Sequence, residues 1–254
     1  MSGLTEIMWT EQAGMPLLLL LQLLPLLGAV VVFAFKERST AVLLDKVFAL
    51  GELLLGIVVV SHINPTLPAL QLAERFAPLA YHVAVDGISM VFLLLAALLT
   101  LLMTLYGMSR GMISPGRLFA VLLLAETGLV GMLVTVNVAW FAAFSALELW
   151  SVVYLLRRWA SSRAEIHALA RFVQYQAFGW VLFAAGCLVL GWGHAEATGG
   201  YWSFDLFDLM GAVPAGKFET AAFYLLFYGL AVRTPLFPLH GWLPNMAQHG
   251  LIAV

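Results

Sequence analysis

Long runs of apolar residues alternate with short polar segments along most of the chain. A helix that crosses the hydrocarbon core of a bilayer needs about 20 mostly apolar residues. Runs of suitable length lie at roughly 15–35, 43–62, 87–108, 118–137, 138–156, 172–192 and 218–233. The pattern therefore predicts an all-α fold, a polytopic transmembrane helix bundle of about seven spans.

Two stretches of this pattern need interpretation. Only Asn137 separates the runs 118–137 and 138–156, but one helix over both would be about 58 Å long, whereas the hydrocarbon core is about 30 Å thick. We therefore assign two spans. The proline-containing segment 64–85 is expected to form a short surface helix, and 194–217 is expected to be the longest polar connection.

The basic residues are distributed unevenly between the two sides of the predicted spans. Basic residues favour the cytoplasmic side of a membrane protein. If the N-terminus lies outside, only Arg75 and Lys217 of the loop residues fall outside, and the others fall inside: Lys36, Arg38, Lys46, Arg110, Arg117, Arg157, Arg158, Arg163 and Arg171. This asymmetry favours an odd number of spans and an N-terminus outside.

The composition agrees with a membrane location and argues against several classes of partner and cofactor. The chain is 63% hydrophobic and 10% charged, whereas soluble domains are about 25% charged. Its 12 basic and 14 acidic residues nearly cancel, so we expect no nucleic-acid partner. The single cysteine, Cys187, excludes an internal disulfide and cannot by itself hold an iron–sulfur cluster. The histidines lie at run ends or in loops, which argues against haem, so we expect neither a cofactor nor a metal in this chain.

Glu148 is the strongest candidate for chemistry. It lies near the middle of the fifth predicted span, with Ser145 and Ser151 on roughly the same helix face. An ionisable group near the bilayer centre is costly and usually lines water or meets a partner. We interpret Glu148 as a proton-accepting carboxylate in a hydrated pocket. The alternative is a hydrogen bond that holds two spans together.

Other acidic residues give weaker signals. Glu126 in the fourth span and Glu52 in the second have small or hydroxyl neighbours, so proton transfer and helix packing are equally good explanations. Asp86 precedes the third span, where an N-cap is favoured. Asp45 and Lys46 lie near a span entrance, and we assign them no site.

The stretch Gly229–Pro244 combines a charge with helix-breaking residues. Arg233 is followed by Pro235, Pro238 and Pro244, and each proline lacks an amide donor and disfavours helix in the residue before it. The helix from 218 must therefore break. Such interruptions occur at ion and substrate sites of transporters. The alternative is an ordinary span that ends in an arginine anchor and a proline-rich loop.

Two histidines follow this break. His240 and His249 could relay protons near neutral pH. A structural role is the alternative, and it is the more common one for singly placed histidines. We keep His240, like Glu126, as a possible proton-transfer residue.

These motifs, taken in order, resemble a known family. Val85-Asp-Gly-Ile-Ser89, Glu148-Leu-Trp-Ser151 and Arg233-Thr-Pro-Leu-Phe-Pro-Leu-His-Gly-Trp-Leu-Pro244 are similar to motifs of the antiporter-like membrane subunits of respiratory complex I (NADH:quinone oxidoreductase), closest to chain M or subunit 4. The similarity covers nearly the whole chain. An outside N-terminus agrees with it.

The resemblance implies a proton channel built from inverted helical repeats, with a discontinuous seventh helix. It divides the single transmembrane domain 1–254 into three initial spans, 15–108, and an incomplete first repeat, 115–254. It makes Glu148 the family's glutamate and places Arg233 at a position where the family has lysine. Arginine stays charged, so it can set the field around Glu148 but is a poor proton carrier. Asn245 also departs from the family, which usually has aspartate there.

The resemblance also suggests the assembly. Family members are longer than this chain, so we expect either a fragment or a split subunit completed by a second chain. We expect other membrane subunits as partners and an energy-coupling membrane, the bacterial plasma membrane, as the location. The leading hypothesis is a proton-translocating subunit of a quinone oxidoreductase. The alternatives are a subunit of a cation/proton antiporter, a membrane-bound hydrogenase or an inorganic-carbon uptake complex, and a purely structural half-domain.

Overall fold

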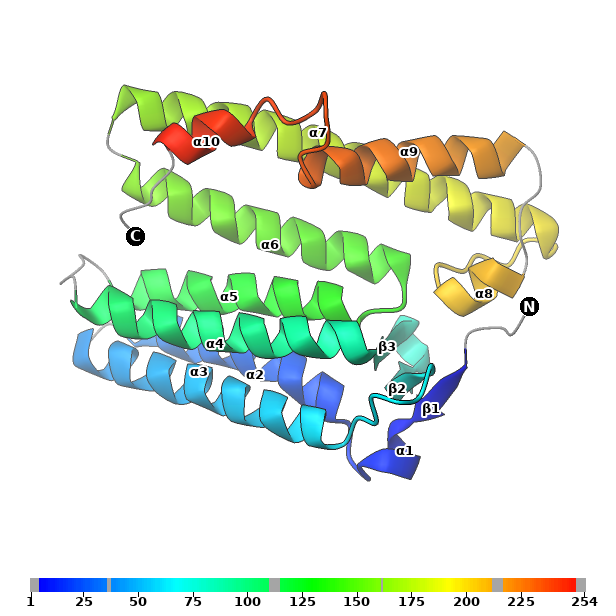
Figure 1. Ribbon diagram of the computed structural model, residues 1–254, viewed down its shortest axis with the longest axis horizontal. Coiled ribbons are helices and arrows are strands. Elements are labelled where there is room, and N and C mark those ends of the chain that lie inside the picture. The colour runs from blue at the N-terminus through cyan, green and yellow to red at the C-terminus, as the bar shows by residue number, and fades with distance from the viewer. Residues whose placement is uncertain (1–4, 36–37, 110–114, 161, 212–216, 250–254) are drawn as a thin grey trace. The chain divides into compact units, whose positions relative to one another are not determined.

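The computed structural model describes residues 5–35, 38–109, 115–160, 162–211 and 217–249. The chain forms two compact units, Met1–Ser151 and Val152–Val254. Helix α6 (Val138–Trp159) contributes residues to both units. Figure 1 shows the helices and strands of each unit.

The first unit is built on four helices that run side by side (Figure 1). They are α2 (Leu17–Ala34), α3 (Arg38–Ser61), α4 (Gly87–Ser109) and α5 (Pro115–Val134). Helix α5 packs against the other three, and α3 packs against α2 and α4. Many large apolar side chains of α2, α3 and α4 remain exposed, as expected for helix faces that contact lipid.

A small sheet lies at one end of these helices, in a segment where we expected a surface helix. Strand β1 (Glu6–Met8) and a short helix, α1 (Trp9–Gln12), precede α2, and β2 (Leu70–Phe76), η1 (Ala77–Leu79) and β3 (Tyr81–Val85) follow α3. The strand order is β1-β2-β3, parallel and then antiparallel. The prediction of a surface helix over 64–85 was wrong, and the all-α prediction omitted this sheet. The strands are stabilised by pairing with β1, which lies far away in the sequence.

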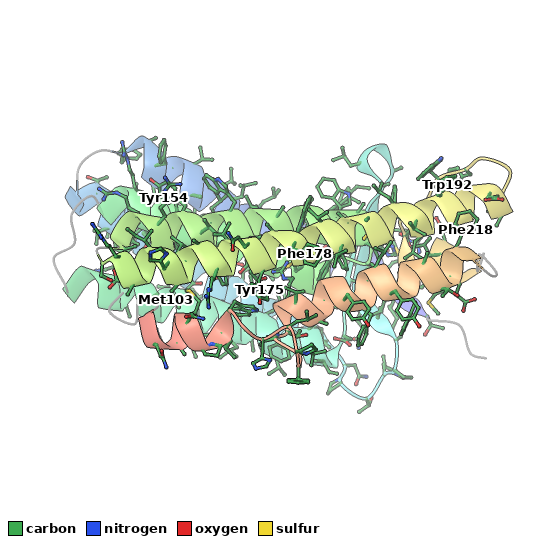
Figure 2. All side chains as sticks on the ribbon, turned by 90° about the horizontal axis from the view of Figure 1, so that it is seen from above. Met103, Tyr154, Tyr175, Phe178, Trp192 and Phe218 are labelled. Atoms are coloured by element: carbon green, nitrogen blue, oxygen red, sulfur yellow. The ribbon has the colours of Figure 1, made fainter. Side chains whose placement is uncertain are left out.

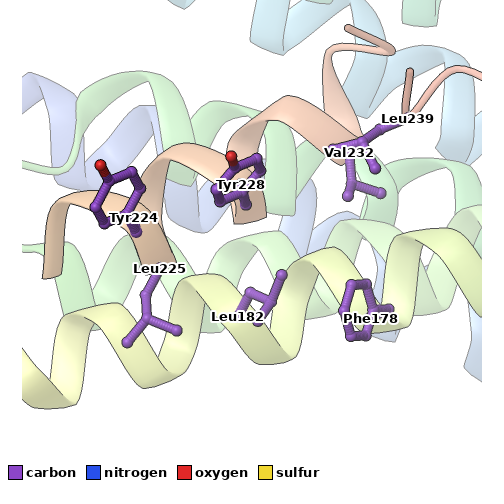
Figure 3. A pocket seen from close by; sticks show the side chains of 7 residues that line it. All are labelled: Phe178, Leu182, Tyr224, Leu225, Tyr228, Val232 and Leu239. Carbon is purple, nitrogen blue, oxygen red and sulfur yellow. The ribbon is translucent and has the colours of Figure 1, made fainter. Parts of the chain in front are cut away.

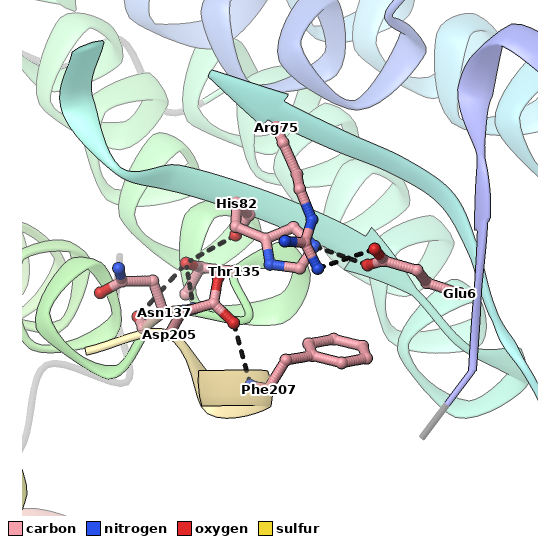
Figure 4. A network of polar contacts seen from close by, with 7 residues as sticks. All are labelled: Glu6, Arg75, His82, Thr135, Asn137, Asp205 and Phe207. Carbon is pink, nitrogen blue, oxygen red and sulfur yellow. Dashed lines mark hydrogen bonds and ion pairs between the residues drawn. The ribbon is translucent and has the colours of Figure 1, made fainter. Parts of the chain in front are cut away.

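Polar contacts hold the sheet strands together. The Glu6 carboxylate lies 2.7 Å from the Arg75 guanidinium and 2.9 Å from Nε2 of His82 (Figure 4). Arg75 is on β2 and His82 is on β3, so one carboxylate from β1 contacts both other strands. This network fixes the N-terminal strand on the hairpin.

Glu74 joins the sheet to the start of α2. Its side chain is fully buried, and its two oxygens accept hydrogen bonds from the backbone N–H groups of Leu18 (2.7 Å) and Leu19 (3.0 Å). A carboxylate at this position caps the unpaired amides of the first helical turn, and its negative charge interacts favourably with the positive end of the helix dipole. Burial nevertheless raises the pKa of Glu74 to about 7, and the two backbone hydrogen bonds only partly offset this effect.

Two helix starts agree with the sequence predictions. The Asp86 carboxylate accepts a hydrogen bond from the Ser89 N–H at 2.7 Å, which confirms an N-cap for α4. Asn137 separates α5 from α6, and its side-chain oxygen accepts from the N–H groups of Ala139 (3.0 Å) and Trp140 (3.3 Å). The assignment of 118–137 and 138–156 to two helices is therefore correct.

The second unit contains α7 (Arg163–Ala197), α8 (Leu206–Gly211), α9 (Lys217–Arg233) and α10 (Leu243–His249). Helix α7 begins well before the predicted residue 172 because Ser162 and Glu165 form a capping box. Helices α7 and α9 lie side by side (Figures 1 and 2), and the rings of Trp192 and Phe218 are 5.8 Å apart.

Glycines allow the close approach of α7 and α9. A Cβ placed on Gly229 would lie 2.6 Å from the Phe183 nitrogen, and one on Gly179 would lie 3.0 Å from the Gly229 oxygen. Larger residues would force the backbones apart, and small residues at such crossings are typical of transmembrane helices. Val232, next to Arg233, is completely buried at this contact.

Each predicted span coincides with a long helix. Within the described residues, five helices are long and apolar enough to cross a membrane, namely α2, α4, α5, α6 and α7. The other two, α3 and α9, match the predicted runs, but α3 contains Asp45, Lys46 and Glu52, and α9 has only 17 residues. A mostly helical membrane fold is confirmed, whereas the total of seven spans stays a prediction.

Candidate proton-transfer site

Glu148 lies at a close contact between the backbones of α5 and α6. A Cβ placed on Gly128 of α5 would lie 2.8 Å from the Glu148 nitrogen and 2.9 Å from both the Glu148 Cβ and the Phe144 oxygen. The absence of a side chain at 128 therefore lets α6 approach α5 at Glu148. Glu148 is half-buried, and Ser151 on the next turn donates its hydroxyl hydrogen bond back to the Leu147 carbonyl at 2.8 Å. Packing thus fixes the backbone from which the carboxyl projects.

Arg233 is the last residue of α9 and is half-buried. The Gly179–Gly229 contact fixes this end of α9 against α7. The helix ends immediately before Thr234-Pro235, as the prolines predict. Interpreting α9 and α10 as the two parts of one discontinuous span stays a prediction.

The proline-rich connection returns to α9 through a tryptophan. The indole Nε1–H of Trp242 donates to the Val232 carbonyl at 3.0 Å, and the Trp242 ring packs edge-on against Phe172 at 5.3 Å. Prolines remove amide donors that would otherwise satisfy carbonyls at the end of a helix. Trp242 replaces one such donor and keeps the connection close to Arg233.

The histidines give a mixed result. His240 is half-buried, its ring lies 5.7 Å from that of Phe237, and its buried Nδ1 has no hydrogen-bond partner among the described residues. It therefore remains a candidate relay group. His249 ends α10, but its side chain lies outside the described residues.

Asn245 of α10 borders a polar pocket of about 410 Å³ with His167 and Arg171 of α7. Its side-chain amide donates to the Gly241 carbonyl at 3.1 Å. The neutral amide at this position brings no negative charge to the neighbouring arginine.

Glu126 does not stand alone, because α3 brings two further buried carboxyls close to it. The exposed fractions are 3% for Glu126, 1% for Glu52 and 0% for Asp45. The Glu126 carboxyl is close enough to those of Glu52 and Asp45 for electrostatic repulsion. Our assignment of no site to Asp45 overlooked this, although its spacing of seven residues from Glu52 places both on one face of α3.

A second pocket, of about 290 Å³, lies between α7 and α9. Figure 3 shows the side chains that line it: Phe178, Leu182, Tyr224, Leu225, Tyr228, Val232 and Leu239. These side chains provide no carboxylate, imidazole or amine. The pocket therefore adds no proton-transfer group to the candidate site.

Glu148 and Arg233 belong to different units, and their predicted pairing stays a prediction. Within the first unit, the structure places Glu148 against α5 and Glu126 among the α3 carboxyls. Within the second, it places Arg233 at the end of α9 and His240 within the connection that follows α9.

Comparison with known proteins supports the resemblance found in the sequence. Residues 137–254 match the family described as NADH:quinone oxidoreductase/Mrp antiporter, transmembrane. The F(420)H(2) dehydrogenase subunit M of Methanosarcina mazei is 26% identical over 91% of this chain and 48% of its own length. The NAD(P)H-quinone oxidoreductase chain 4 of Gloeobacter violaceus is 28% identical over 92% of this chain and 44% of its own length.

A solved structure gives the same result for the fold. A chain of respiratory complex I from Thermus thermophilus matches with a TM-score of 0.73 and 24% identity, covering 91% of this chain and 47% of that one. This chain spans about half the length of the relatives it matches. The resemblance to antiporter-like membrane subunits of the chain M or chain 4 type is therefore confirmed, and the coverage fits the first half of such a subunit.

Proposed function

We propose that this chain, similar to the first half of an antiporter-like membrane subunit, is a proton-translocating subunit of a complex I-type quinone oxidoreductase. It would couple quinone reduction to proton transfer without holding a redox centre itself. The observation that carries the proposal is Glu148, a half-buried carboxyl in the middle of an apolar helix, packed directly against Gly128.

In this proposal Glu148 takes up and releases the proton, and Arg233 controls its charge. A nearby positive charge favours an ionised carboxylate, whereas removing that charge favours the protonated acid. Guanidinium stays protonated, so Arg233 acts through its field and not as a proton carrier. Glu126 and His240 are secondary candidates for proton transfer.

The decisive test replaces Glu148 in the assembled complex. Glu148→Gln keeps the side-chain shape but cannot exchange a proton, so we expect proton pumping to fall at least about tenfold with normal assembly. Pumping is measured with a pH-sensitive dye in membrane vesicles during quinone reduction. Glu196→Gln, at the exposed end of α7, is the matched control. Normal pumping by the Glu148 variant would contradict the proposal.

Arg233 is tested by two substitutions that differ in charge. Arg233→Lys keeps a positive charge and Arg233→Gln removes it, so we expect the lysine variant to pump and the glutamine variant to lose most of its pumping. Equal pumping by both variants, with a difference only in thermal stability, would instead support a structural role for this chain.

We propose seven spans, a discontinuous seventh helix, an N-terminus outside and a location in a bacterial plasma membrane. The partners are other membrane subunits of a multi-subunit complex. The unequal distribution of basic residues and the similarity to subunits of membrane complexes support these assignments. Copurification followed by mass spectrometry identifies the partner chains. Recovery without any membrane partner would count against them.

The orientation is testable because the chain has one cysteine, Cys187, which is buried. In a Cys187→Ala background, cysteine is introduced at Ala164 or Ala197, which are exposed near opposite ends of α7. A membrane-impermeant maleimide should label position 197 and not 164 in intact cells. The reverse pattern would place the N-terminus inside.

A cation/proton antiporter subunit is the second candidate, because the matched family description names both oxidoreductases and Mrp antiporters. The two candidates require different partners. Copurifying flavin- and iron–sulfur-containing subunits would favour the oxidoreductase. Sodium-dependent proton exchange by a complex lacking them would favour the antiporter.

A further inference from the structure

Three carboxyl groups lie together inside the first unit, on the helices that precede the candidate site. Asp45 and Glu52 lie on one face of α3, two turns apart, and Glu126 lies on α5. Helices α3, α4 and α5 pack against one another in all three pairs. The three side chains, here called the carboxyl cluster, are therefore enclosed by helices.

The six oxygens of the carboxyl cluster have neither solvent nor hydrogen-bond partners. All six are buried and unpaired within the described part of the chain. The nearest polar groups are hydroxyls of α4: Thr104 lies near Asp45 and Thr100 lies near Glu126, without hydrogen-bond geometry to either carboxyl. The Thr104 hydroxyl instead donates to the Thr100 carbonyl at 3.0 Å.

Among the side chains that the structure describes, the helices around the carboxyl cluster supply no compensating charge. Helix α2 has no ionisable residue, and α4 has no charged one. The basic residues of α3 and α5 are Arg38, Lys46 and Arg117. Arg38 begins α3, Arg117 is exposed near the start of α5, and the described residues show no salt bridge from Lys46 or Arg117 to the cluster.

These conditions strongly disfavour ionisation. An unpaired carboxylate in a low-dielectric interior costs several kcal/mol, and a proton removes that cost. A second negative charge nearby would be still less favourable because the carboxyls repel one another. The cluster therefore fits protons as ligands, and it can lose them only one at a time.

The carboxyl cluster lies away from Glu148. Glu148 contacts α5 at Gly128, two residues after Glu126. Two residues correspond to about 200° around a helix, so Glu126 and Gly128 occupy opposite faces of α5. Helix α5 thus stands between the carboxyl cluster and Glu148.

We propose that Asp45, Glu52 and Glu126 form a second proton-binding site, held protonated in the resting protein and exchanging its protons with water one at a time. This site is independent of the role proposed for Glu148. Its occupancy is measured through the carboxyl groups themselves, so its failure and the failure of the proposed pumping function are distinguishable.

Infrared difference spectroscopy of the purified complex at neutral pH tests the proposal. Asp45→Asn, Glu52→Gln and Glu126→Gln should each remove absorption from a protonated carboxyl carbonyl, whereas Glu196→Gln, at an exposed position, should remove carboxylate absorption. In D₂O the protonated-carboxyl band should shift with time. Loss of carboxylate absorption from two or more of the cluster variants, or a band that never shifts in D₂O, would overturn the proposal.

A second measurement uses the unmodified complex and covers variants that fail to fold. Dicyclohexylcarbodiimide reacts with protonated carboxyls in apolar surroundings: the acid proton moves to a carbodiimide nitrogen, the carboxyl oxygen adds to its carbon, and rearrangement gives a stable N-acylurea. Mass spectrometry should find this adduct on the carboxyl cluster, with a rate that falls as pH rises, and not on exposed Glu196 or Glu219. Adducts only on exposed carboxyls would overturn the proposal.

Discussion

The contact between Gly128 and Glu148 allows the candidate site to be perturbed without changing any ionisable group. In Gly128→Ala the new Cβ would meet the Glu148 nitrogen at 2.8 Å, whereas ordinary contacts begin near 3.4 Å. Helices α5 and α6 must therefore separate by about 0.6 Å. Two of the three closest atoms are backbone atoms, so no side-chain rotation relieves the contact.

The expected magnitude combines two opposing effects. Overpacking of a well-packed interface costs about 1–3 kcal/mol, with the upper end expected for a backbone contact. Alanine is favoured over glycine within a helix by about 1 kcal/mol. The net destabilisation of about 2 kcal/mol should lower the melting temperature by roughly 4–8 °C for a chain of this size.

The assay measures thermal unfolding by tryptophan fluorescence in detergent and proton pumping in vesicles. We expect pumping to fall several-fold because displacement of a proton-transfer group by a fraction of an ångström weakens its alignment. Gly87→Ala is the matched control, since a Cβ at that helical position meets nothing within 4 Å. Normal stability and pumping in Gly128→Ala, at the level of the control, would refute the close packing at Glu148.

Two further predictions concern the β-sheet of the first unit and the end of α9. Burial raises the pKa of Glu74 from 4.5 to about 7, so protonation of Glu74 stabilises the folded state fully below pH 4.5, and this stabilisation is lost as pH rises through about 7. The melting temperature should therefore decline across this pH range in the unmodified protein but not in Glu74→Gln, and identical pH profiles of the two proteins would contradict the prediction. Trp242→Phe keeps the ring packing on Phe172 but removes the hydrogen bond to the Val232 carbonyl, so we expect the free energy of unfolding to fall by about 1 kcal/mol and the melting temperature by roughly 2–4 °C. An unchanged melting temperature would show that this hydrogen bond does not contribute to stability.

Local patterns in the sequence predicted most helices and their breaks. Helix α9 ends at Arg233, as Pro235 requires, and Asn137 caps α6. Asp86 caps α4 as expected. These features depend on neighbours within about one helical turn, so the residue types alone carry the information.

Features that depend on contacts between distant segments were predicted only in part or not at all. The strands over 70–85 have short, ordinary sequences, and their pairing partner β1 lies more than 60 residues earlier. The sequence predicted the carboxyl cluster only in part. Asp45 lies near a span entrance, which is typical of an interfacial residue, and only the packing of α5 brings Glu126 next to it. No local pattern reports which distant segment will pack against a given face.

The apolar runs, the helix-breaking prolines and the resemblance to antiporter-like subunits were determined by the sequence alone, because hydrophobicity and backbone restriction are properties of each residue and its neighbours. Tertiary structure decided which charges share an environment. The helix packing places Glu148 against Gly128. It also brings Asp45, Glu52 and Glu126 together without a counter-charge among the described residues. Whether a buried carboxyl holds a proton depends on the groups around it, and only packing brings those groups together.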